Sequence, residues 1–267
     1  RYGHFGDRAQ FIPFPYPFRR PKGMTPEEYA VKLVAEFKRL FENEYHGVWD
    51  PKVRESEFAA FYIETIQGTG GYVIPPMNFY PELKKILDDH GILLVVDEIQ
   101  MGFYRTGKLW SFEHFGITPD VLVFGKALTN GLNPLAGVWA KEEMINPEVF
   151  PVGSTHSTFA SNPLGTAVGL EVMQMLAEKD YEKQIMESGA YFLEGLKDLQ
   201  SRHPEMVDIG LSGTLEYKGQ KCGLVLDVGG YYKNVITFAP NLEISREEID
   251  QAMVLLEQLF NRAKKEM

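Results

Sequence analysis

The sequence predicts an α/β fold with a mainly parallel, doubly wound sheet and a smaller C-terminal α+β domain. Three short segments, "ILLVV", "VLVF" and "LAGVWA", are almost uninterrupted apolar runs. Strands that are buried on both faces of a sheet have this appearance. Segments with apolar residues at helical spacing lie around these runs. Strands that alternate with helices are typical of parallel sheets, so we expect βαβ connections here.

The N-terminal elements each have a local signal. Proline and aromatic residues fill segment 11–24, and they predict an extended chain because proline fixes φ and removes a donor. Thr25 is a suitable N-cap for the next helix, with Pro26 at its first position. A buried strand is predicted over 58–64. An amphipathic helix is then expected to end at Gly91, because glycine suits the position after a helix.

The second half of the chain is expected to begin with a long helix capped by Ser161. We place a domain boundary near Lys179, which makes residues 1–178 part of a large domain and residues 179–267 a small one. The final helix has a capping box formed by Ser245 with Glu248. The other elements expected in the small domain are a helix over 181–203 and strands over 223–228 and 234–240.

Composition narrows the classes of function. The net charge of −10 argues against a nucleic-acid partner and against an anionic membrane surface, because both attract basic patches. No apolar run approaches the ~20 residues of a membrane span. Cys222 is the only cysteine, so no disulfide can form within the chain. A reduced, cytoplasmic setting is therefore expected.

Charged residues follow three of the predicted strands. Glu64 comes after "FYI", Asp97 after "LLVV" and Lys126 after "VLVFG". Ligands of open α/β sheets bind beyond the carboxyl ends of the strands, so these side chains are candidates for one site. A pyridoxal phosphate enzyme needs a lysine for the Schiff base and a carboxylate against the pyridine nitrogen. Asp97 and Lys126 supply that pair, although either alone would be read as a solvated strand end.

Four motifs in the same order resemble the class III aminotransferases, which are pyridoxal phosphate enzymes of fold type I. The resemblance runs from about Phe58 to the C-terminus. Its motifs are "IETIQGTGG", "VVDEIQMGFYRTGK", "DVLVFGKAL" followed by "NGLNPLAG", and "THSTFASNPLG". Thr65 stands in the first motif where proline is usual. Four such motifs together are far more specific than any one of them.

The resemblance implies a role for each site residue. Lys126 would form the Schiff base with pyridoxal 5'-phosphate and move the proton during catalysis, while Asp97 would hold the protonated ring. Gln100 would lie near the phenolic oxygen of the cofactor. Thr158 would bind the cofactor phosphate across the interface of a homodimer with shared active sites. Glu64 would be a third catalytic-site residue, matching an acid that in several relatives pairs with the arginine that binds the substrate carboxylate.

Two departures from the family pattern affect what the resemblance implies. Most of the long region that precedes "FAAFYIE" in the family is absent, and with it the expected phosphate loop and ring-stacking aromatic residue. Thr237 stands where many members carry an arginine that binds a substrate carboxylate. Glutamate is therefore expected to be a poor substrate. A substrate with an extra amine or several hydroxyl groups is expected to be a better one.

The first interpretation is an aminotransferase that moves an amino group from a donor to a keto or aldehyde acceptor. A racemase or epimerase on the same fold needs the same cofactor chemistry, and the motifs do not separate the two reactions. A non-catalytic remnant is the third interpretation. It is favoured by the missing N-terminal region and opposed by the presence of both Lys126 and Asp97.

Overall fold

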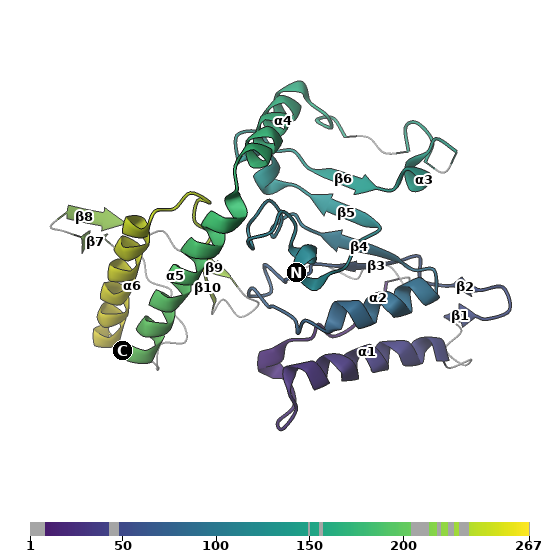
Figure 1. Ribbon diagram of the computed structural model, residues 1–267, viewed down its shortest axis with the longest axis horizontal. Helices are drawn as coiled ribbons and strands as arrows, with labels where there is room; N and C mark the ends of the chain where they lie inside the picture. The colour runs from purple at the N-terminus through teal and green to yellow at the C-terminus, as the bar shows by residue number, and fades with distance from the viewer. Residues whose placement is uncertain are drawn as a thin grey trace.

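The computed structural model describes residues 9–42, 48–148, 150–154, 157–203, 214–217, 220–223, 227–229 and 235–266. Its centre is a sheet with the strand order β3-β4-β5-β6 (Figure 1). Strands β3 (Ala60–Ile63), β4 (Leu93–Asp97) and β5 (Val121–Phe124) are parallel, and β6 (Gly137–Ala140) runs antiparallel at one edge. The mainly parallel α/β sheet expected from the sequence is confirmed.

The two faces of this sheet have different surroundings. Helices α1 (Pro26–Glu42) and α2 (Phe79–Asp89) lie together on one side (Figure 1). Leu94, Val96 and Leu122 are buried in the same apolar cluster as residues of both helices. The opposite face includes Tyr62 and Val138, which are 60% and 66% exposed. Asp97 lies on this open face as well. Its partners in the register are Val123 and, one strand further, Val138. Tyr62 pairs with Val95, which is two residues before Asp97 and so lies on the same face.

Three of the predicted helix ends are confirmed. The Thr25 hydroxyl accepts the Glu28 N–H at 3.2 Å, and the Glu28 carboxylate accepts the Thr25 N–H at 2.7 Å. Ser245 and Glu248 exchange the same pair of bonds, at 3.2 and 2.8 Å. Gly91, with φ 65°, follows the last residues of α2 in the left-handed conformation that glycine tolerates.

The predicted cap of the next long helix was wrong by one residue. Helix α4 (Pro163–Glu178) is capped by Asn162, whose side-chain oxygen accepts the Gly165 N–H at 2.7 Å. Ser161 lies outside the helix with φ 52°. Proline at the first helical position explains the shift, because the cap is then the residue directly before Pro163.

The C-terminal part contains two long helices and short antiparallel strand pairs. Helices α5 (Tyr181–Arg202) and α6 (Arg246–Glu266) lie side by side (Figure 1), and Tyr191 of α5 donates to Asp250 of α6 at 2.5 Å. The strand expected over 223–228 overlaps the end of β8 (Gln220–Gly223) and the start of β9 (Asp227–Gly229), and residues 224–226 lie outside the described residues. The strand expected over 234–240 corresponds to the shorter β10 (Val235–Thr237), and residue 234 lies outside the described residues. No helix in the described part of the chain is long and apolar enough to cross a membrane. The remaining elements are β1 (Trp49–Asp50), β2 (Glu55–Ser56), α3 (Glu142–Ile145), β7 (Thr214–Tyr217), β8 (Gln220–Gly223), β9 (Asp227–Gly229) and β10 (Val235–Thr237).

Candidate active site

Three of the charged residues singled out in the sequence meet at the carboxyl edge of the sheet. Glu64 follows β3, Asp97 is the last residue of β4, and Lys126 begins a short 3-10 helix directly after Gly125 and β5. The register pairs Ile63 with Val96 and Asp97 with Val123, so the three strands end at the same level. The fold therefore brings these groups to one edge, as parallel strands should.

Electrostatics link the three groups. Burial raises the pKa of the Glu64 carboxyl, while the hydrogen bond from the Gly68 N–H opposes that shift. The negative charge of Asp97 raises the Glu64 pKa further and the positive charge of Lys126 lowers it. Glu64 thus responds to both partners across the edge. The Lys126 side chain is exposed, and among the described residues it has no ion-pair partner, so its amine is accessible to a ligand.

Two donors hold the Asp97 carboxylate. Its Oδ1 accepts the Ile99 N–H at 2.9 Å, and its Oδ2 accepts the Tyr62 hydroxyl at 3.0 Å. Burial, followed by the hydrogen bond to Asp97, raises the pKa of Tyr62 to about 12. The sequence interpretation missed Tyr62. Its position two residues before Glu64 puts it on the face of Asp97, but only the strand register shows that the hydroxyl reaches the neighbouring strand.

Gln100 bonds Tyr72 and packs closely against Gly68. Its Nε2 donates to the Tyr72 hydroxyl at 2.7 Å. A Cβ atom on Gly68 would lie 2.3 Å from Gln100 Oε1, which is far inside van der Waals contact. The Gly68 N–H also donates to Glu64 Oε2 at 2.8 Å. Gly68 therefore contacts two site residues, Glu64 and Gln100, and Tyr72 is a further contact that the sequence did not indicate.

A buried polar network lies directly behind the site. Glu98 is completely buried and accepts the Ser111 hydroxyl at 2.6 Å, the Ser111 N–H at 3.0 Å and the Phe112 N–H at 3.0 Å. The Thr65 hydroxyl lies 3.4 Å from Glu98 and also contacts Ser111. Burial raises the pKa of Glu98, and these donors oppose the shift. Thr65 stands where proline is usual in the family motif. Its hydroxyl joins this network, so Thr65 has a structural function.

Two basic residues of the second motif, Arg105 and Lys108, bond to the C-terminal part of the chain, and Thr158 lies in a turn. Thr158 is in an exposed turn before α4, and no hydrogen bond among the described residues joins it to Asp97 or Lys126. Arg105 donates to the Pro240 carbonyl at 2.7 Å, and Lys108 pairs with Glu182 at 2.5 Å. These bonds tie the segment after β4 to the C-terminal part of the chain.

Thr237 ends β10, and its hydroxyl is buried without a hydrogen-bond partner in the part of the chain that is described. The next residue, Phe238, lines a hollow of about 430 Å³. Tyr72 and Arg105 line the same hollow. Tyr72 also bonds Gln100. The hollow therefore adjoins the group formed by Glu64, Asp97, Gln100 and Lys126, which we call the strand-end cluster.

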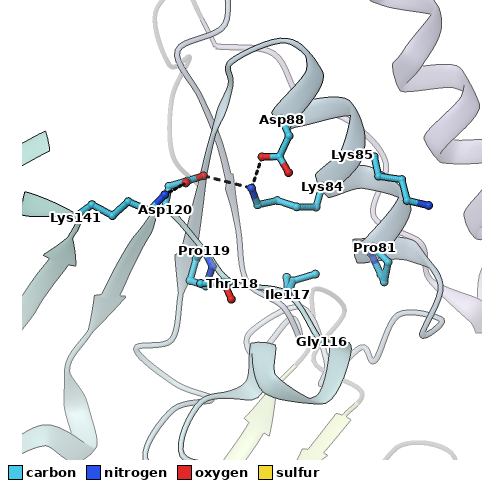
Figure 2. Close-up of a pocket in the computed structure, with 10 residues that line it drawn as sticks. All are labelled: Pro81, Lys84, Lys85, Asp88, Gly116, Ile117, Thr118, Pro119, Asp120 and Lys141. Atoms are coloured by element: carbon cyan, nitrogen blue, oxygen red, sulfur yellow. Dashed lines mark hydrogen bonds and ion pairs between the residues drawn. The ribbon is translucent and has the colours of Figure 1, made fainter. Parts of the chain in front are cut away.

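A second hollow, of about 400 Å³, lies beside the start of β5 rather than its end (Figure 2). Asp120, which precedes β5, accepts the Leu94 N–H at 2.8 Å. It also pairs with Lys141 at 3.3 Å and with Lys84 at 3.8 Å (Figure 2). The charges here neutralise one another within the chain, so this network is structural and the strand-end cluster is the better site.

The side chains at the strand-end cluster fit a pyridoxal phosphate ring. Asp97 uses one donor on each oxygen, so each oxygen keeps a lone pair for a ring N–H. Lys126 offers an accessible amine, and Gln100 offers an amide. A carboxylate, an amine and an amide are the groups that the ring nitrogen, the aldehyde carbon and the phenolic oxygen require.

Comparison with known proteins identifies the family of this chain. The family model described as Aminotransferase class-III matches residues 7–260. The alanine/serine racemase of Pyrococcus horikoshii is 32% identical over 267 aligned residues, which cover 92% of this chain and 55% of that protein. The ornithine aminotransferase of Brevibacillus brevis is 36% identical, with 76% and 52% covered.

A solved structure of a transaminase is also similar to this chain. The (S)-enantioselective omega-transaminase from Thermomicrobium roseum superposes with a TM-score of 0.76 at 29% identity, covering 93% of this chain and 59% of that one. The chain spans little more than half the length of the relatives that it matches. The family model nevertheless covers nearly the whole sequence, and the chain belongs to the class III aminotransferases.

Proposed function

We propose that the protein containing this chain is a pyridoxal 5'-phosphate-dependent aminotransferase, which moves an amino group from an amino donor to a keto or aldehyde acceptor. The observation that carries the proposal is the meeting of Glu64, Asp97 and Lys126 at one sheet edge. Family membership supports the cofactor, because the class III aminotransferases depend on pyridoxal phosphate.

The cofactor, when bound, supplies a protonated ring that withdraws electrons from the substrate. Lys126 provides the amine for its covalent attachment and a base for the proton on the substrate's α-carbon. Asp97 would accept the ring N–H and so keep the ring protonated. Gln100, whose amide bonds Tyr72 and lies against Gly68, would contact the phenolic oxygen.

The proposal includes a homodimer with shared active sites. Thr158 would bind the cofactor phosphate of the other subunit. Support comes from the apolar surface around it, because Val152, Phe159 and Leu164 are 98%, 76% and 62% exposed. We also propose that residues 1–178 form part of the large cofactor-binding domain and residues 179–267 the small domain. We also propose a reduced, cytoplasmic location, which the single cysteine supports.

The substrate class is inferred from Thr237 and Glu64. Thr237 cannot bind a carboxylate in the bidentate way that arginine can. Burial already raises the pKa of Glu64, and no basic side chain bonds it among the described residues. A donor with an extra amine or several hydroxyl groups would complement this carboxylate better than a dicarboxylic amino acid would.

The deciding experiment is borohydride reduction of the complete protein followed by peptide mass mapping. We expect a pyridoxyl adduct on Lys126 and its loss in Lys126→Ala. Lys52→Ala, in an exposed turn, is the control and should keep the adduct. An adduct on another lysine would contradict the assignment. The lack of any adduct, together with no visible absorbance, would favour a non-catalytic remnant.

A racemase is the second candidate, because proteins named alanine/serine racemase and leucine/methionine racemase are 32% and 30% identical to this chain. Both reactions would use Lys126 and Asp97 in the same way. Incubation with one enantiomer and no keto acid separates them. Racemisation would continue under these conditions, whereas amino transfer would stop once the cofactor had accepted one amino group.

A further inference from the structure

Tyr62 contacts the group that is proposed to hold the cofactor ring. It lies on β3, one strand away from Asp97, on the open face of the sheet. Its ring is mostly exposed, but its hydroxyl donates to Asp97 Oδ2 at 3.0 Å. A tyrosine on a solvated sheet face would not need such a partner. The bond therefore has meaning chiefly for Asp97.

Tyr62 is also the side chain that bonds the second oxygen of this carboxylate. Asp97 Oδ1 bonds the Ile99 N–H of its own turn, a local contact that leaves the carboxylate free to tilt. The Tyr62 hydroxyl binds the other oxygen from a different strand. Two donors on two oxygens, from two elements, define the plane of the carboxylate.

We propose that Tyr62 is a positioning residue for the cofactor ring, acting through Asp97 to direct the carboxylate at the ring nitrogen and to keep the ring proton on that nitrogen. This inference rests on the proposed function of Asp97. A hydroxyl donor stabilises the anionic form of a carboxylate, so the shared proton remains on the ring. Without this donor the carboxylate would remain but would point less accurately at the ring nitrogen. Errors of this kind in the orientation of a site residue lower the reaction rate.

The first test uses protein without cofactor and measures the hydrogen bond itself. Burial and Asp97 raise the pKa of Tyr62 to about 12, and the charge of Glu64 acts in the same direction. Carbon-13 labelling of tyrosine side chains would follow the Tyr62 signal by NMR during a pH titration, with Tyr62→Phe for assignment. We expect the pKa of Tyr62 to fall in Asp97→Asn. An unchanged pKa would show that the bond is absent and would overturn the proposal.

The second test uses the cofactor-loaded protein and a matched control. Tyr191→Phe also removes a tyrosine hydroxyl from an aspartate, Asp250, but between α5 and α6. We expect Tyr62→Phe to lower kcat about tenfold with little change in KM, and to shift the nitrogen-15 resonance of labelled cofactor. Tyr191→Phe should change neither quantity.

The outcomes separate the two proposals. If borohydride attaches the cofactor to Lys126 but Tyr62→Phe matches Tyr191→Phe in kcat and in the nitrogen-15 shift, then the positioning function of Tyr62 is wrong and the proposed function stands. If Lys126 carries no adduct, the proposed function fails, and the inference fails with it even where the Tyr62 titration confirms the hydrogen bond. A selective shift in Tyr62→Phe supports the inference.

Discussion

Replacing Gly68 by alanine should displace the Gln100 side chain and lower activity, with little change in the free energy of unfolding. The new Cβ would lie 2.3 Å from Gln100 Oε1 and 2.6 Å from its Cδ. An ordinary contact requires the amide to move by about 1 Å. Gln100 is a flexible side chain, so it can move, but it then leaves the Tyr72 hydroxyl that it bonds at 2.7 Å.

The expected free energies nearly cancel. Losing the Gln100–Tyr72 hydrogen bond costs about 1 kcal/mol. Replacing glycine by alanine at a permissive φ gains roughly 0.4–1 kcal/mol by restricting the unfolded chain, and Gly68 does not lie in the left-handed region. The free energy of unfolding should therefore change by less than about 1 kcal/mol. Activity should fall by about tenfold to a hundredfold, because a displacement of this size disturbs a reacting group.

Urea unfolding and steady-state kinetics of the complete protein would measure the two effects. Gly70→Ala is the control, because Gly70 lies on the same turn. The nearest atoms to its new Cβ would all belong to the Gln67 side chain, with Oε1 closest at 2.9 Å. This variant should leave both quantities close to those of the wild type. If Gly68→Ala keeps full activity, then the position of Gln100 is not important for the reaction. If it unfolds the protein, then the turn cannot adjust as argued.

Three further predictions use the same assays. Asp97→Asn should lower kcat by about a hundredfold or more, because each factor of ten corresponds to ~1.4 kcal/mol of transition-state stabilisation, while the circular dichroism spectrum stays native; near-normal turnover would refute the role of Asp97. Thr237→Arg should improve glutamate as an amino donor if the missing arginine limits its binding, and wild type that already uses glutamate with a low KM would contradict this explanation. Asp120→Ala should lower the free energy of unfolding by about 2–3 kcal/mol, because its side chain, 13% exposed, bonds the Leu94 N–H and pairs with Lys84 and Lys141. Asp198→Ala, which removes an exposed pair with Arg202, is the control and should cost about 0.5 kcal/mol or less.

Much of the fold could be predicted because its signals are local. Apolar runs marked β4 and β5. Thr25 before Pro26, and the Ser245–Glu248 pair, marked two helix starts to the residue. The edge that holds Glu64, Asp97 and Lys126 followed from these elements. Parallel strands must end on the same side, so no knowledge of side-chain contacts was needed.

The contacts within the site could not be predicted in this way. The bond between Tyr62 and Asp97 depends on the register of two strands, which the sequence does not state. Tyr72 reaches Gln100 from a turn where its own φ is 56°, a conformation that is uncommon for tyrosine. Thr65 departs from the residue expected there, and only its buried contacts show what the hydroxyl does.

The backbone of Lys126 has a consequence for how this position responds to mutation. Its φ is 43°, in the left-handed region that costs a lysine about 1 kcal/mol or more relative to glycine. Selection for folding alone would therefore favour glycine or asparagine at this position. A lysine here lowers stability and has no ion-pair partner among the described residues. Such a trade-off is expected where an amine is retained for chemistry, and a protein engineer who screened only for melting temperature would tend to remove it.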